Sequence, residues 1–164
     1  MKIGILCVSD RCSRGACEDR SGALIREIVA SVSTQTDYLL VPDEKDEIQT
    51  ALIKLADQAH CDVVFTTGGT GFAPRDVTPE ATLAVIDRAA PGISEAIRAK
   101  SLLITPHAML SRAVSGIRSK TLIVNLPGSP KAVRESLEIV LPILPHAVET
   151  LSGITINCGG SYGK

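Results

Sequence analysis

The chain has 164 residues, a length typical of one domain, and 17 Lys and Arg against 18 Asp and Glu give a formal net charge of −1. This balance argues against a protein that binds the phosphate backbone of nucleic acid, and the absence of Trp argues against a base-stacking surface. Since no stretch is long and apolar enough for a membrane-spanning helix, we expect neither nucleic acid nor membrane as a partner.

The cysteines give a second compositional signal. Five are present, an odd number without any Cys-x-x-Cys pair: Cys7, Cys12, Cys17, Cys61 and Cys158. Such spacing suggests neither a zinc site nor a disulfide framework. The apolar run at the start of the chain is too short for a signal peptide. We therefore predict free thiols and a cytoplasmic protein.

Short apolar runs alternate with segments of helical periodicity along the chain. The runs are continuously apolar, as strands covered on both faces of a parallel sheet are. Strands are predicted at residues 2–8, 37–41, 62–66 and 121–126. Segments 18–32 and 44–59 place apolar residues at i, i+3, i+4 and i+7, which predicts amphipathic helices.

Three hydroxyl-proline pairs predict helix starts in the second half: Thr78-Pro79, Thr105-Pro106 and Ser129-Pro130. The hydroxyl can accept a hydrogen bond from an unpaired amide of the first turn, while Pro has no amide that needs a partner. Together with the alternation of strands and helices, this predicts an α/β fold, a three-layer α/β/α sandwich with a mostly parallel central sheet. We assign residues 1–150 to one domain and 151–164 to a C-terminal tail.

Residues 66–72, "TTGGTGF", follow a predicted buried strand and precede a helix. Glycines without a Cβ can turn consecutive amides toward one anion, and threonine hydroxyls can add donors. The alternative is a tight turn that binds nothing. The Walker pattern is excluded because Gly-Lys occurs only at the last two residues, and Pro74 breaks the dinucleotide pattern. If a phosphate binds here, the loop is a different kind of cradle.

Three carboxylates follow the predicted strands or the loop. Asp10 and Asp43 come just after two strands, and Asp76 ends the glycine loop, as we call residues 66–76. Acids that face a phosphate would repel it unless a divalent cation lies between them, as in Mg²⁺ sites. Taken singly, Asp43 is explained as a helix cap and Asp10 as a turn residue. Taken together, the three predict metal-assisted phosphoryl or nucleotidyl transfer.

Two further groups of residues are candidates for anion binding. Arg75 is expected to bind a phosphate oxygen, although a pair with a neighbouring carboxylate is the alternative, and Arg11 stays open between the two. The segment "NLPGSP" (125–130) lies before a predicted helix N-terminus, which is either an anion site or an ordinary capped connection. Ser111 and Arg112 lie near a predicted helix end.

With these residues in view, the chain resembles the molybdopterin adenylyltransferase family of molybdenum-cofactor biosynthesis. The resemblance covers nearly the whole chain in the family's order. It is carried by "CVSDR" (7–11), "EDRSG" (18–22), "VPDE" (41–44), "TTGGTGFAPRDVTPEAT" (66–82), "PGISEAIR" (91–98), "TPHAMLSRAVSGIR" (105–118) and "LIVNLPGSPKAVRE" (122–135).

The resemblance implies Mg²⁺-dependent transfer of AMP from ATP to the terminal phosphate of molybdopterin, with release of pyrophosphate. It implies that Asp43 and Asp76 are the catalytic acids and hold Mg²⁺. Nucleotide phosphates are expected at Thr67, Gly68, Gly69, Thr70, Gly71 and Arg75. The pterin is expected at Ser9, Asp10, Ser111, Arg112, Asn125, Gly128 and Ser129. The alternative function is a non-catalytic molybdopterin- or nucleotide-binding accessory protein of the same fold.

Self-association is expected as well. A mean hydropathy of +0.22 with 45% hydrophobic residues is apolar for a lone domain, and segment 83–104 holds more apolar positions than one core-facing stripe requires. The resembled family implies a homotrimer and a transient contact with the downstream molybdenum-insertion enzyme.

Overall fold

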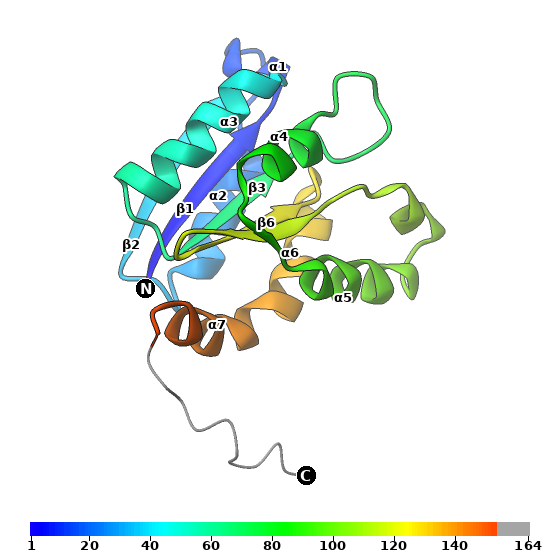
Figure 1. Ribbon diagram of the computed structural model, residues 1–164. Coiled ribbons are helices and arrows are strands. Elements are labelled where there is room, and N and C mark those ends of the chain that lie inside the picture. Colours follow the sequence, from blue (N-terminus) through cyan, green and yellow to red (C-terminus); the bar gives the residue numbers. More distant parts are fainter. Residues whose placement is uncertain (154–164) are drawn as a thin grey trace.

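The computed structural model describes residues 1–153 and places a six-stranded sheet between two layers of helices (Figure 1). The strands are β1 (Lys2–Val8), β2 (Gln35–Val41), β3 (Val63–Thr67), β4 (Arg88–Ala89), β5 (Ser115–Arg118) and β6 (Thr121–Leu126). The predicted three-layer α/β/α sandwich is therefore confirmed. The expected tail, residues 151–164, lies outside the described residues from 154 onward.

Helices connect these strands. The α-helices are α1 (Asp10–Ser13), α2 (Arg20–Val29), α3 (Lys45–Ile53), α4 (Thr78–Val85), α5 (Pro91–Leu102), α6 (Pro130–Val140) and α7 (Leu144–Leu151). A π-helical turn η1 (Lys54–Gln58) extends α3, and the 3₁₀ turns are η2 (Pro106–Leu110) and η3 (Leu141–Ile143). None of the helices described, α1 to α7, is long and apolar enough to cross a membrane.

The strand order is β2-β1-β3-β6-β5-β4; the first four strands are parallel, and β5 is antiparallel to both of its neighbours, β6 and β4. The parallel strands end at one edge of the sheet, where Cys7 lies opposite Thr67, and Thr67 opposite Leu126. Strand β1 lies between β2 and β3, so the chain passes from β1 to β2 on one side and then returns past β1 to β3 on the other. In open α/β sheets, such a reversal of strand order opens a crevice beyond the carboxyl ends of the strands.

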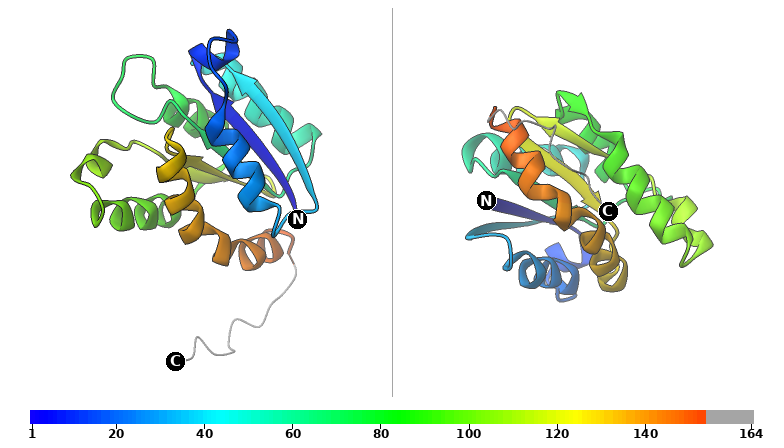
Figure 2. Two further views of the ribbon diagram at one scale, coloured as in Figure 1. Left: turned by 180° about the vertical axis from the view of Figure 1, so that it is seen from behind. Right: turned by 90° about the horizontal axis from the view of Figure 1, so that it is seen from below.

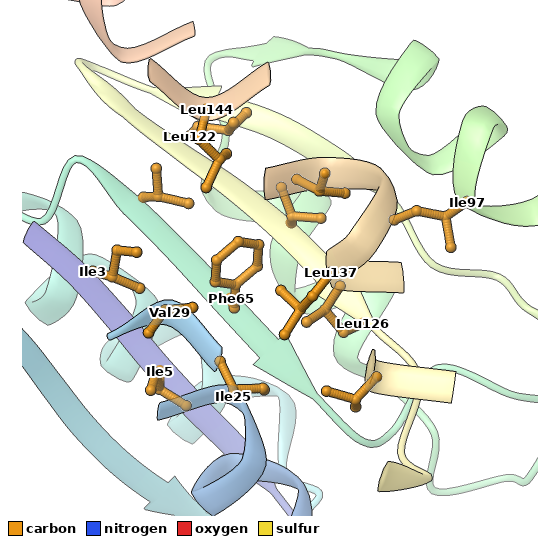
Figure 3. Close-up of a cluster of buried hydrophobic side chains, with 14 residues drawn as sticks. Ile3, Ile5, Ile25, Val29, Phe65, Ile97, Leu122, Leu126, Leu137 and Leu144 are labelled. Carbon is orange, nitrogen blue, oxygen red and sulfur yellow. The ribbon is translucent and has the colours of Figure 1, made fainter. Parts of the chain in front are cut away.

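Two aliphatic clusters hold the three layers together. One packs α2, α5, α6 and α7 against the face of the sheet that includes Phe65, with Ile25 and Leu137 fully buried against it (Figure 3). Seen from behind, α2, α6 and α7 cover this face (Figure 2). The other cluster packs α3 and α4 on the opposite face through residues such as Ile48 and Ala81. Burial on both faces explains why the parallel strands read as continuous apolar runs.

The three predicted helix starts differ in outcome. Ser129 caps α6 by accepting from the amide of Ala132, and Thr105 caps the short turn η2 by accepting from the amide of His107. The prediction for Thr78 was wrong, because α4 begins with Thr78 itself and its fully buried hydroxyl donates to Gly68 O at 2.9 Å. This hydroxyl ties the helix to the glycine loop.

The prediction of free thiols was wrong for one pair of cysteines. The short helix α1 turns the chain so that the Cα atoms of Cys12 and Cys17 lie 4.7 Å apart, and the two form a disulfide. Cys7 and Cys61 are free and buried, and burial raises the pKa of the Cys61 thiol to about 11. Cys158 lies outside the described residues.

Candidate active site

The carboxyl edge of the sheet brings Asp10 and Asp43 together, as the strand pattern predicted. The amide of Asp10, after β1, donates to Asp43 Oδ2 at 2.8 Å, and the amide of Asp43, after β2, donates to Asp10 Oδ1 at 3.2 Å. These reciprocal bonds fix the two loops against each other. The loops that follow β1 and β3 lie at the same end of the sheet (Figure 1).

Asp43 does not cap the following helix, which was the alternative explanation for it. The N-cap of α3 is Glu44, and it makes no side-chain capping bond. Burial raises the pKa of Asp43; the amide of Asp10 offsets part of the rise, and the carboxylates of Asp10 and Asp76 add to it. An acid that is partly desolvated beside two like charges favours a cation nearby.

Asp76 shapes the end of the glycine loop. Its Oδ2 accepts hydrogen bonds from the amides of Gly71, at 3.0 Å, and Ala73, at 3.1 Å. A Cβ on Gly71 would lie 2.9 Å from this same oxygen, and one on Gly69 would lie 3.1 Å from Asp43 Oδ1. The two carboxylates expected to bind metal therefore both border the loop.

Asp10 is engaged by an arginine. Arg75 donates through Nε to Asp10 Oδ2 at 2.7 Å and through Nη2 to Asp10 Oδ1 at 2.9 Å, and it also pairs with Glu44 at 2.8 Å. This fork lowers the pKa of Asp10. Of the two expectations for Arg75, the structure contains the pair with carboxylates.

The expected set of three acids is smaller in the structure. Within residues 1–153, no group of three or more His, Cys, Asp or Glu side chains could hold a metal ion. Asp10 is bound to Arg75, so the pair left at the loop is Asp43 and Asp76. This corrects the prediction of a three-acid cluster.

The glycine loop adopts the backbone conformation that the sequence suggested. Gly68 has φ +96° and Gly69 has φ +64°, a region that side chains disfavour. A Cβ on Gly68 would collide with Val8 O, and one on Gly69 with the hydroxyl of Thr78. The amides of Gly69 and Thr70 donate to no acceptor within the described part of the chain. Two adjacent N–H groups are thus available for an anion.

Two hollows adjoin the loop. The first, about 310 Å³, is bordered by Thr70, Gly71, Ser111 and Ser129, and its apolar wall includes Ile97 and Leu110. The second, about 390 Å³, is bordered by Ser9, Thr67, Gly68 and Gly128. A Cβ on Gly128 would lie 3.5 Å from Gly68 Cα, so the two glycines pass close together. The glycine loop contributes to both hollows.

The residues expected at the pterin therefore fall into separate places. Ser111 and Ser129 border the first hollow, whereas Ser9 and Gly128 border the second. The prediction of direct contact is wrong for Asn125, which has no exposed surface. Its Nδ2 donates to the hydroxyls of Thr66 and Thr82, and its Oδ1 accepts from the amide of Val114. Asn125 holds β6, β3 and α4 together beneath the site.

Arg112 is also engaged within the protein. Its guanidinium donates to Gly71 O at 2.7 Å, to Asp76 O and to Glu80, and it borders neither hollow.

The sequence did not reveal that Thr78 and Glu80 support the loop. The signal for Thr78 was present in "VTPE" but was interpreted as a helix cap alone.

Comparisons of sequence and of structure with known proteins point to one family. The family model described as "Probable molybdopterin binding domain" matches residues 4–146. The molybdopterin adenylyltransferase of Helicobacter pylori J99 is 48% identical over 154 residues, which cover 92% of this chain and 88% of that protein. The enzyme of the same name from Escherichia coli K12 is 46% identical over 141 residues, 84% of this chain and 72% of that protein. A crystal structure of the molybdopterin biosynthesis enzyme MoaB from Thermus thermophilus superposes with a TM-score of 0.85 at 50% identity, covering 93% of this chain and 96% of that one.

Proposed function

This chain belongs to the family of molybdopterin-binding domains, and we propose that it is a molybdopterin adenylyltransferase. The reaction transfers AMP from ATP to the terminal phosphate of molybdopterin and releases pyrophosphate. The observation that carries the proposal is the pair Asp43 and Asp76, which borders a glycine loop with two amides that have no acceptor among residues 1–153. Carboxylates placed against an anion cradle suit nucleotidyl transfer with a divalent cation between them.

The residues present fit Mg²⁺. This ion is usually bound through one or two carboxylates, with waters and substrate phosphates as its other ligands, so a site with two acids suffices. Asp43 and Asp76 would hold it; burial raises the pKa of Asp43, and the carboxylate of Asp76 adds to the rise. When bound, the ion neutralises the phosphate charge that would otherwise oppose attack.

The chain's own groups would bind and align the two anions. We assign the nucleotide phosphates to Thr67, the segment Gly68–Gly71 and Arg75, where the amides of Gly69 and Thr70 can donate to them. Arg75 would have to exchange a carboxylate partner for a phosphate oxygen. No general base is required, because the attacking phosphate is already ionised near neutral pH. Catalysis then depends on alignment and charge neutralisation.

Two hollows beside one cradle suit two substrates that must meet at their phosphates. We assign pterin binding to Ser111 and Ser129, which border the first hollow, and to Ser9 and Gly128, which border the second. Asp10 would act through its bonds to Arg75 and Asp43. Whichever of the two hollows holds the pterin, the phosphates of both substrates would converge on the glycine loop.

The decisive experiment is incubation of the protein with molybdopterin, ATP and Mg²⁺, scored for pyrophosphate and adenylylated pterin. Both products should accumulate in equal amounts and depend on Mg²⁺. Binding of molybdopterin or ATP without either product would instead identify a non-catalytic accessory protein. Failure to bind either substrate would refute both functions.

We further propose that the protein works in the cytoplasm as a homotrimer and passes its product to a molybdenum-insertion enzyme by transient contact. The relatives in cofactor biosynthesis support the pathway. Exposed apolar side chains support an association surface, of which Leu103, 81% exposed, is the most prominent.

A further inference from the structure

Arg112 makes four hydrogen bonds to the loop and to the helix that follows it. Its amide donates to Thr70 O at 2.9 Å and its Nε to Gly71 O at 2.7 Å. Its two terminal nitrogens donate to Asp76 O and to a carboxylate oxygen of Glu80, in α4. One side chain and its own amide thus contact both ends of the segment 70–76.

Asp76 closes the same segment from within. Its Oδ2 accepts from the amides of Gly71 and Ala73, and its own amide donates to Ala73 O at 2.9 Å. The bond from Arg112 to Asp76 O therefore fixes the residue whose carboxylate orders the turn. If Arg112 were lost, both the carbonyl of Asp76 and the orientation of its side chain would be less constrained.

A direct role for Arg112 in binding substrate does not fit these contacts. All three guanidinium nitrogens already donate to protein oxygens, and the side chain borders neither hollow. The neighbouring Ser111 does border the first hollow. Adjacent residues thus face different environments, and the pair of Arg112 with Glu80 faces the loop.

We propose that Arg112 is a positioning residue: with Glu80 as its charge partner, it fixes the conformation of the glycine loop and orients the carboxylate of Asp76 beside the substrate phosphates. The inference rests on the proposed function for the role of Asp76, but the fixing of the loop by Arg112 is independent of that function. Guanidinium groups suit such a task because the planar fork can engage several acceptors at fixed angles, which an ammonium group cannot.

The test compares Arg112→Lys and Glu80→Gln with the parent protein. The control is Arg118→Lys, since Arg118 makes a similar set of bonds, to Asp57 and to Val85 O, near the opposite edge of the sheet. Four quantities are measured for each: amide hydrogen exchange at Gly71 and Ala73 by NMR, Mn²⁺ binding in the presence of ATP by electron paramagnetic resonance, molybdopterin affinity by fluorescence, and kcat from the release of pyrophosphate.

For a positioning residue, Arg112→Lys should speed exchange of both loop amides about tenfold or more and weaken Mn²⁺ binding, and kcat should fall while molybdopterin affinity stays within about twofold. Glu80→Gln should show the same pattern more weakly, and Arg118→Lys should leave all of these quantities unchanged. A loss of molybdopterin affinity with normal exchange, or no change in exchange, would overturn the proposal. A parent protein without adenylyl transfer would defeat the proposed function. The amide hydrogen exchange and Mn²⁺ binding measurements would still decide whether Arg112 fixes the conformation of the loop.

Discussion

The carboxylate of Asp76 orders the glycine loop, and the proposed function gives it a chemical task as well. We expect Asp76→Asn to keep the fold and molybdopterin binding but to lose adenylyl transfer by about a thousandfold or more. An Asn side chain retains one oxygen for the amides of Gly71 and Ala73, yet it is neutral and a weak ligand for Mg²⁺. Pyrophosphate release at saturating Mg²⁺ measures the effect.

The matched control for this change is Asp87→Asn. Asp87 also accepts a backbone hydrogen bond, from the amide of Ser119 at 2.6 Å, but at a turn remote from the glycine loop. The control should turn over at the parent rate. Near-normal turnover in Asp76→Asn would remove Asp76 from the mechanism.

Asp43 should cost the protein stability in the absence of metal. Because burial raises its pKa, the native state holds its proton to higher pH than the unfolded chain, so stability falls as pH rises from the unfolded pKa through the raised one. Asp43→Asn removes this cost and keeps an oxygen for the amide of Asp10. We expect the variant to melt about 1–3 °C higher at pH 7 while losing activity.

The pH dependence of this gain is its check. Thermal melts without metal should show the gain shrinking between pH 7 and pH 4, as Asp43 of the parent protein takes up its proton. A gain of equal size at both pH values would mean that the effect has another origin than charge.

The glycine loop is the element where a backbone substitution is most informative. Gly69→Ala places a Cβ at φ +64° and against the hydroxyl of Thr78, so we expect a loss of about 1–2 kcal/mol in unfolding free energy and weaker ATP binding. Gly128→Ala should melt like the parent, because its Cβ would lie 3.5 Å from Gly68 Cα in ordinary contact.

The contrast between the two variants distinguishes a cradle from a simple turn. If the loop binds phosphates, the added methyl in Gly128→Ala narrows the second hollow and weakens binding of a substrate without a change in melting temperature. If the loop is only a turn, calorimetric titrations should give both variants the affinities of the parent for ATP and molybdopterin, once the affinities are expressed per folded molecule.

The parallel strands and their helices were predictable from sequence, because burial on both faces leaves continuous apolar runs such as those of β1 and β6. Strands β4 and β5, which pair antiparallel to each other, were not predicted. Strand β4 consists of two exposed residues and β5 of four residues, and such short segments carry no periodicity. Their place in the sheet depends on the pairing of β5 with β6 and of β4 with β5, which are tertiary interactions.

The candidate site was predictable to the level of the loop and its acids. Strand ends place Asp10, Asp43 and the glycines together whatever the details of the side chains. The partners of Arg75 and Arg112 were not predictable, because Asp10 and Glu80 lie 65 and 32 residues away from them in sequence. Such distant pairs are fixed only once the loops have packed.

At the scale of the whole molecule, five of the eight large apolar side chains that are exposed among the described residues lie around the end of α5 and in η2. Leu102, Leu103 and Ile104 end the segment 83–104 that was expected to self-associate, and Met109 and Leu110 extend it. Leu103 is 81% exposed and Met109 65%. Single exposed apolar residues are common, but a run of adjacent ones in both segments favours a protein interface.

We expect the protein to sediment at micromolar concentration with about three times the 17.3 kDa mass of one chain. Leu103→Asp should shift the equilibrium toward one chain, because a charge would have to be buried at the interface. The same change should leave the unfolding of the isolated subunit within about 0.5 kcal/mol, since the side chain is exposed there. Ala23→Asp, at an exposed position of α2 outside the segment 83–104, is the comparison for an added charge and should keep the parent mass. A parent mass near that of one chain would defeat self-association, and twice that mass would reject the trimer.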